Sequence, residues 1–449
     1  MFEKFSHFFK RGFLKAYRFS VLNSLNPLLN MVVRVLGGLA SAGPAVLALQ
    51  YLDKASYGRA ASNYALALVL VGPISQYCTQ GYLRQLVNNI SSRRGDLFYG
   101  KSAIAIYLMF ATVALALAST LHLIGYDDFI FTESLMVIVV LMRMQEAYYV
   151  SRDWQRMSII FFYVSPPMAI CLVIFLLKKL TTTDDYLLVS IAQLVSFSSA
   201  VIASMLLKKD SLIYIKRWRA VTTWQDLGKE FSSVRVFLLN GAMLSATEQI
   251  PIILLRQFGL GAAIPAFELV RKLCSVPSIL VHALSMFFLP RLIASERDRA
   301  WHDFRNIFFQ FSVVLAFFGL AYVVTVLMAT AFLSDMGSSL VRHVDFPVLW
   351  ALLAAATVTS LAAPSGAALI ALRGETWWTI GGLCSLTIQL VTCAIAAPRL
   401  ASAGVAISVL AQNIVLSCIV AWASHRLLNV AQRNSGFTGS KVDPYQGVL

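Results

Sequence analysis

Ionisable side chains interrupt long apolar stretches of this chain, and they are the residues with the clearest potential for chemistry. Arg34 is flanked by Met31-Val32-Val33 and Val35-Leu36-Gly37-Gly38, with no acidic residue within one helical turn. A charge at the centre of a bilayer costs about 2.5–3.5 kcal/mol, so it marks a function or a partner on another helix. Because guanidinium forms paired hydrogen bonds with phosphate oxygens, Arg34 is a candidate anion-binding residue. A structural salt bridge is the alternative.

Two further groups combine acids and bases at helical spacing. Arg143 and Glu146 lie three residues apart, and Glu268 precedes Arg271 and Lys272 by three and four residues. Residues at these separations share one helix face, so local ion pairing is one explanation for both groups. The second group leaves one cation in excess, which also makes it a candidate site for an anionic ligand.

A carboxylate lies at the matching depth of a later apolar stretch. An offset of 210 residues places Glu248 against position 38, about one turn from Arg34, so the two are expected to face each other across a cleft. Glu248 is then either half of a salt bridge or a protonatable coupling group, a role for which Glu146 and Glu268 are also candidates. Arg256 adds a cation nearby. Polar residues that are expected to contact substrate hydroxyls, or else to pack between helices, are Tyr64, Gln76, Tyr77 and Gln80.

The composition indicates that these residues are positioned by apolar helices. The chain of 449 residues is 58% hydrophobic and only 13% charged, with a mean hydropathy of +0.71. Soluble proteins are roughly 45–50% apolar and 25% charged, and one membrane span needs about 20 apolar residues. The predicted spans are 21–49, 60–80, 103–124, 132–150, 158–177, 187–207, 234–256, 267–290, 306–333, 347–371, 379–397 and 404–425.

The basic residues are distributed unevenly between the two sides of these spans. If the N-terminus is cytoplasmic, 25 of the 37 Lys and Arg residues fall in cytoplasmic segments and seven on the opposite side. Positive charge is enriched on the cytoplasmic side of membrane proteins, so both termini are predicted to be cytoplasmic. The net charge of +15 is therefore attributed to topology, and because it forms no single patch, nucleic acid is not an expected partner.

The segments outside the spans are short. Residues 1–20 are predicted to form a basic amphipathic arm on the phospholipid surface, or else a disordered lead-in. Residues 208–233 form a basic cytoplasmic linker between lobes at 21–207 and 234–427, and 428–449 are predicted to be a disordered tail. The pairs Asp127/Asp128 and Asp184/Asp185 are interpreted as solvated charges of outward loops. The six cysteines lie in apolar runs and give no support for a disulfide or zinc site; no metal or cofactor is expected.

An internal repeat relates the two halves of the chain. Leu28-Leu29-Asn30 recurs as Leu238-Leu239-Asn240, an offset of 210, and Pro73 has a counterpart within a few residues of that spacing in Pro277. Six spans in each repeat give both halves the same orientation. Parallel repeats of this kind form one class of secondary transporters, with the binding site between the halves.

Four segments resemble the multidrug/oligosaccharidyl-lipid/polysaccharide (MOP) exporter superfamily, especially its Wzx-type polysaccharide flippases. They are Tyr51–Ala60, Ala266–Leu273 with Phe288-Leu289-Pro290-Arg291, Pro364–Gly374 and Ala403–Ile407, and the resemblance covers about residues 20–427. It implies an all-α integral membrane protein of about twelve helices, in two parallel six-helix lobes around a central cleft (MATE-like), that works by alternating access. It also implies a bacterial inner-membrane location and a polyprenyl-pyrophosphate-linked oligosaccharide substrate for O-antigen, capsule or exopolysaccharide synthesis. Arg34 would bind the pyrophosphate, and the polymerase and glycosyltransferases of the pathway are candidate partners.

Three other functions stay open. A cation-coupled multidrug exporter of the same superfamily is one, although drug-exporting relatives tend to carry an acid in the first span, where this chain has Arg34. A lipid II flippase is another, but that branch typically has extra helices. A glycan polymerase or ligase would need a large outward loop with its working residues, and no such loop, nucleotide-binding loop or nucleophile–base set is found. The chain is therefore predicted not to be an enzyme.

Overall fold

The described part of the first half of the chain folds into helices that correspond to the first six predicted spans. The computed structural model describes residues 33, 35–76, 99–120, 125–151, 155–180, 184–207, 224–335 and 344–436. The first span is helical over 35–40, turns at 41–42 and continues as α3. The elements of this half are α3 (Gly43–Tyr51), α4 (Lys54–Gln76), α6 (Tyr99–Thr120), α7 (Tyr126–Ser151), α8 (Gln155–Ile159), the π-helix η3 (Ile160–Val164), α9 (Ser165–Leu180) and α10 (Asp185–Leu207).

The second half repeats this arrangement. Its elements are α12 (Trp224–Gln257), the 3-10 turn η4 (Gly261–Ala263), α13 (Ile264–Cys274), α14 (Val276–Arg297), α15 (Trp301–Asp335), α16 (Phe346–Ala371) and α17 (Glu375–Gly436). The element α17 is a hairpin of two helices, because the backbone leaves helical geometry at Ala401 (φ 50°, ψ −128°). The described residues are all helical or connecting, without strands, which confirms the predicted all-α fold of two six-helix lobes.

Several boundaries differ from those predicted. The helix α12 begins at Trp224, inside the expected 208–233 linker, and α17 continues to Gly436, past the start of the expected disordered tail at 428. The eighth span is not one helix but two, α13 and α14, separated at Ser275. Pro277 lies in the first turn of α14, where its missing N–H leaves no helical hydrogen bond unmade. The predicted arm at 1–20 lies outside the described residues.

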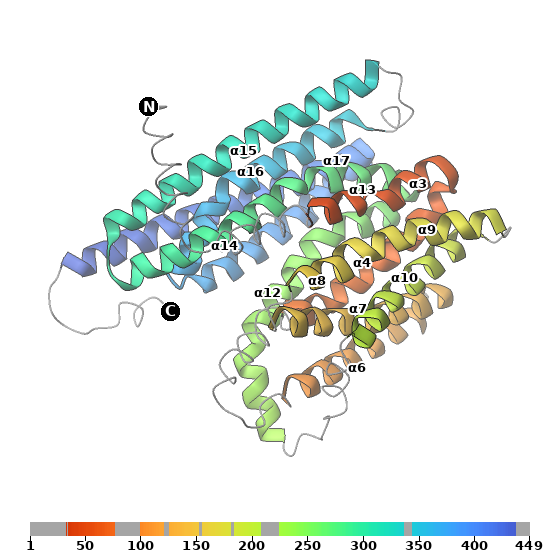
Figure 1. Ribbon diagram of the computed structural model, residues 1–449, viewed down its shortest axis with the longest axis horizontal. Coiled ribbons are helices and arrows are strands. Elements are labelled where there is room, and N and C mark those ends of the chain that lie inside the picture. Colours follow the sequence, from red (N-terminus) through yellow and green to blue (C-terminus); the bar gives the residue numbers. More distant parts are fainter. Residues whose placement is uncertain are drawn as a thin grey trace.

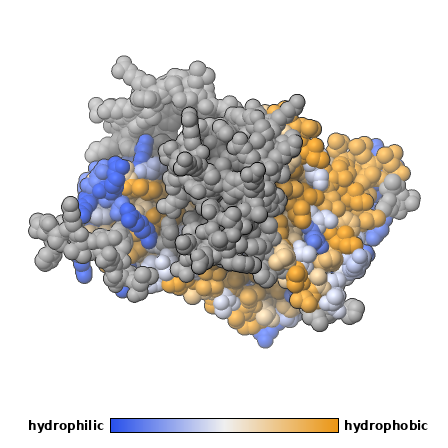
Figure 2. Space-filling view, turned by 90° about the horizontal axis from the view of Figure 1, so that it is seen from below, coloured by the Kyte–Doolittle hydropathy of each residue, from blue (hydrophilic) through white to orange (hydrophobic). Residues whose placement is uncertain are grey.

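The lobes expose apolar side chains over much of their surface. Among the described residues, six helices are long and apolar enough to cross a membrane. On α15, Phe309, Phe317 and Phe332 are each about two-thirds exposed. Figure 2 shows such hydrophobic surface over a broad area of the molecule. Exposed apolar patches this extensive are typical of a surface that faces lipid.

The two bundles meet along α4 and α12, as Figure 1 shows. These helices run antiparallel in close contact. A Cβ atom added to Gly58 would lie 2.9 Å from the carbonyl carbon of Gly261, and one added to Gly72 would lie 2.8 Å from the carbonyl oxygen of Gly241. Only glycine allows so close an approach. The contact between α4 and α12 with η4, called the seam below, is therefore tight from the start of α4 to the middle of the membrane-spanning region.

The buried apolar core shows which end of the lobes is packed together. The larger cluster passes from the first lobe into the second through Ile252, Leu255 and Phe267, near the end of α12 and the start of α13. The smaller cluster, which includes Phe288 and Phe311, is made of residues from α14 to α17 and stays within the second lobe. The apolar packing between lobes is thus concentrated at the end where α4 begins.

Candidate functional site

The first charged group predicted from the sequence is a compact cluster in the first lobe. Arg143 Nη1 donates to Glu146 Oε2 at 2.6 Å and to the hydroxyl of Tyr163 at 3.0 Å. The Tyr163 hydroxyl in turn donates to Glu146 Oε1 at 2.6 Å. Arg143 and Glu146 lie on α7, whereas Tyr163 comes from the π-helical turn η3. The buried Nε–H of Arg143 has no hydrogen-bond partner among the described residues.

The second charged group lies on α13, in the other lobe. Arg271 pairs with Glu268 at 3.5 Å and donates to the backbone carbonyl of Glu248 at 2.5 Å. Glu268 also accepts a hydrogen bond of 2.8 Å from the hydroxyl of Tyr57, on α4 of the first lobe. This contact joins the lobes. Lys272 forms no hydrogen bond or salt bridge among the described residues, and its ammonium is in electrostatic range of Glu248 and Glu268.

Tyr64 connects these two groups in space. It stacks on Phe197 with ring centroids 5.3 Å apart, and it is in electrostatic range of Arg143, Glu268 and Arg271. One side chain of α4 is therefore in electrostatic range of charges on both α7 and α13. The described cations and carboxylates balance, with Arg143, Arg271 and Lys272 against Glu146, Glu248 and Glu268.

Glu248 differs from the other acids of this site. Its side chain is exposed, and its carboxylate forms no salt bridge within the described part of the chain. The expected pairing with Arg34 lies outside the described residues, as do Tyr77 and Gln80. Gln76 is the last residue of α4, and its side chain is not part of the described structure. These four stay predictions.

Arg256 lies in a separate network at the end of the bundle where α4 begins. Its Nη2 donates to Asp128 Oδ2 at 2.8 Å, and its Nη1 donates to Ser62 Oγ at 2.9 Å and Asn63 Oδ1 at 2.7 Å. Arg59 Nε donates to Asp128 Oδ1 at 2.9 Å. In this structure Arg256 is bound to Asp128, Ser62 and Asn63, which are not members of the Arg143 and Arg271 groups.

Asp128 corrects one interpretation made from the sequence. Its side chain is only 3% exposed, so it is not a solvated loop charge, although Asp127 beside it is exposed. Besides the two arginines, it accepts hydrogen bonds from Asn63 at 2.6 Å and from the Tyr186 hydroxyl at 2.9 Å. It lies in the first turn of α7, where a helix N-terminus favours an anion. This helix N-terminal position is the one feature of the sequence that could have indicated a bound carboxylate at Asp128.

The second acidic pair is also structural in part. Asp185 accepts a hydrogen bond of 2.5 Å from Lys178 and one of 2.7 Å from the backbone N–H of Asp53, so it is bonded to protein groups and not simply solvated. Asp53 caps α4 by accepting the Ser56 N–H at 2.7 Å. The hydrogen bond from the Ser56 backbone N–H holds the pKa of Asp53 below its usual value. These contacts fix the connection between α3 and α4.

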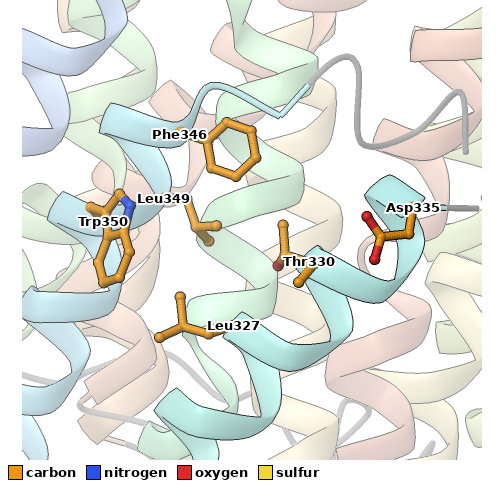
Figure 3. Close-up of a pocket in the computed structure, with 7 residues that line it drawn as sticks. Leu327, Thr330, Asp335, Phe346, Leu349 and Trp350 are labelled. Carbon is orange, nitrogen blue, oxygen red and sulfur yellow. The ribbon is translucent and has the colours of Figure 1, made fainter. Parts of the chain in front are cut away.

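A pocket of about 420 Å³ lies between α15 and α16. Figure 3 shows Leu327, Thr330 and Asp335 of α15 beside Phe346, Leu349 and Trp350 of α16. It has one carboxylate and no cation, so it does not suit an anionic ligand. Within the described residues, no group of His, Cys, Asp and Glu is arranged to hold a metal ion.

Comparison with solved structures identifies the fold. An inward-facing MATE family multidrug transporter of the MOP superfamily matches with a TM-score of 0.63 at 12% identity, over 90% of this chain and 96% of that chain. An outward-facing MATE structure matches with a TM-score of 0.54 at 11% identity, over 91% and 96%. A MATE transporter from Vibrio cholerae matches with a TM-score of 0.53 at 14% identity, over 91% and 97%. The chain has the MATE transporter fold.

The MATE-like fold and the apolar helices make the chain a multi-pass membrane protein. No family model and no curated protein matches its sequence. The fold accounts for the arrangement of the helices in two lobes. It does not assign the ligand, whose chemistry depends on the side chains between the helices.

Proposed function

We propose that the chain is a transporter of the MOP superfamily that moves polyprenyl-pyrophosphate-linked oligosaccharide repeat units outward across the bacterial inner membrane. The observation that carries this proposal is that Arg143 and Arg271, one from each lobe, are both in electrostatic range of Tyr64. Arg143 also donates to the Tyr163 hydroxyl, and Glu268, the partner of Arg271, accepts from the Tyr57 hydroxyl. Cationic side chains suit phosphate oxygens, and tyrosines suit sugar rings and hydroxyls. The lipid tail would remain in the bilayer while the head group passes between the lobes.

The charge balance of the site indicates how an anion would bind. Arg143 and Arg271 are each paired with a carboxylate, whereas the ammonium of Lys272 forms no salt bridge with any of the described residues. Lys272, with Arg34 from the first span, is therefore the proposed pyrophosphate-binding pair. Protonation of Glu248 would leave cations in excess and favour the anion, which is the reason to propose it as the coupling group, with Glu146 and Glu268 as alternatives.

A deletion strain tests this proposal directly. Loss of the chain should cause lipid-linked repeat units to accumulate on the cytoplasmic side, and expression of the intact protein should restore glycan export. Arg34→Ala and Arg34→Lys should both impair that rescue. Normal glycan export in the deletion strain, or full rescue by Arg34→Ala, would reject the assignment.

A cation-coupled multidrug exporter is the second candidate. It is favoured by the exposed Glu248 carboxylate on α12, which would attract a cationic drug, and by the multidrug transporters that share the fold. In that case the deletion strain would gain drug sensitivity and export glycan normally. The same experiment therefore separates the two functions. Only the flippase proposal predicts that the chain works together with the glycosyltransferases and polymerase of a glycan pathway.

A further inference from the structure

The network around Asp128 bridges the two lobes in an asymmetric way. Arg59, Asn63 and Tyr186 belong to α4 and α10, in the same lobe as Asp128. Arg256 is the donor from the other half of the chain, in the last turn of α12. One buried carboxylate therefore binds two arginines, of which only one crosses between the lobes.

Release of Arg256 would leave Asp128 well satisfied. Arg59 would still donate at 2.9 Å, Asn63 at 2.6 Å and Tyr186 at 2.9 Å. The Arg59 guanidinium also lies 4.1 Å from the ring centroid of Tyr186, which holds it in place. No unpaired buried charge would result, so the large penalty that normally opposes breaking a buried ion pair is absent.

Arg256 itself is placed for reversible release. Its side chain is 35% exposed, so water is available to replace the protein acceptors. It directly precedes the turn at Gly259, whose φ of +74° ends α12 before η4 and α13. Any movement that separates α12 from α4 at this end must withdraw Arg256 from Asp128, Ser62 and Asn63.

We propose that Arg256 is a reversible latch between the lobes. Bound to Asp128, it holds together the end of the bundle that the charge distribution places on the outer side. Its withdrawal opens that end, while Arg59 keeps the Asp128 charge compensated in the first lobe. The latch requires only that the two lobes move relative to one another, and it does not depend on the identity of the substrate.

Distance measurement between spin labels on the two lobes tests the latch. Suitable positions are Leu180, at the end of α9, and Leu400, beside the bend of α17, which are 77% and 52% exposed. Both are replaced by cysteine in a full-length chain whose six native cysteines are changed to alanine, and the protein is studied in lipid nanodiscs without substrate. The population with a long inter-label distance then reports opening at this end.

Arg256→Gln and Arg59→Gln form a matched pair, because they remove the same group from the same carboxylate. Arg256→Gln should raise the ratio of long to short distances about tenfold, as expected for the loss of charge-assisted hydrogen bonds. Arg59→Gln should leave that ratio unchanged, because its contact lies within one lobe. No change with Arg256→Gln, or an equal change with Arg59→Gln, overturns the proposal.

Arg256→Lys provides a second variant in case Arg256→Gln does not fold. An ammonium group can keep one contact with Asp128 but cannot reproduce the forked contacts with Ser62 and Asn63. It should raise the ratio of long to short distances about threefold, and an unchanged ratio overturns the proposal. Because no substrate is present, a failed glycan-export assay does not affect the result.

Discussion

Replacement of Gly58 by alanine should disfavour the closed arrangement of the seam. The added Cβ would lie 2.9 Å from the carbonyl carbon of Gly261 and nearer still to its oxygen, whereas ordinary contacts begin at 3.4 Å. The two backbones must therefore separate by at least about 0.5 Å. Because both atoms belong to main chain, no side-chain rotation relieves the overlap. Overpacking of this kind costs about 1–3 kcal/mol, which corresponds to a shift of roughly 5- to 150-fold in a two-state equilibrium.

The Leu180–Leu400 label pair measures this effect, since the overlap exists only while α4 and η4 are in contact. The long-distance population should rise in Gly58→Ala. Gly319→Ala is the matched control, because a Cβ on Gly319 meets only the Cβ of Ser360 at 3.8 Å within the second lobe. Unchanged distances in a folded Gly58→Ala protein would refute the reasoning, and so would the same shift in Gly319→Ala.

Three other substitutions test separate parts of the structure. Asp128→Asn should destabilise the folded protein by about 2 kcal/mol, because two arginines lose their anionic acceptor. Asp127→Asn is the control and should not change the melting temperature, because Asp127 is exposed. Equal melting temperatures of the two variants would contradict the burial of Asp128. Tyr57→Phe removes the hydrogen bond to Glu268, which is worth about 1 kcal/mol. It should raise the long-distance population about fivefold in the same spin-label assay. No rise would mean that this hydrogen bond does not hold the lobes together. Lys272→Gln should slow translocation of a pyrophosphate-linked lipid in proteoliposomes about tenfold, whereas Lys272→Arg should retain most of the rate. Normal transport by Lys272→Gln would remove this residue from the proposed site.

Hydrophobic patterning predicted the fold well because a membrane span is a property of one continuous segment. The six-plus-six arrangement and the helix-face pairs Arg143/Glu146 and Glu268/Arg271 follow from local spacing, and both pairs form salt bridges. The break of the eighth span at Ser275 was missed, since an apolar run across Pro277 reads as one helix.

Contacts between distant segments were not accessible from spacing. Asp128 was misassigned because its partners Asn63, Tyr186 and Arg256 are 58 to 128 residues away in sequence. Neither hydropathy nor charge counting reports which ends of spans are adjacent. The same limit applies to Tyr163, an aromatic residue in an apolar stretch whose hydroxyl completes the Arg143–Glu146 cluster.

The π-helical turn η3 gives Tyr163 two partners on different spans. Its hydroxyl contacts Glu146 on the fourth span, and its backbone carbonyl lies 3.1 Å from where a Cβ on Gly37 of the first span would be. A π-helical turn holds more residues than an α-helical one, so the side chains of α9 are rotated relative to a continuous helix from α8. Deleting one residue from Ile160–Val164 would restore that continuous helix and turn Tyr163 away from one partner. The fifth span is therefore in contact with both neighbours at this one residue: with the fourth span at Glu146 and with the first span at Gly37, three residues beyond Arg34.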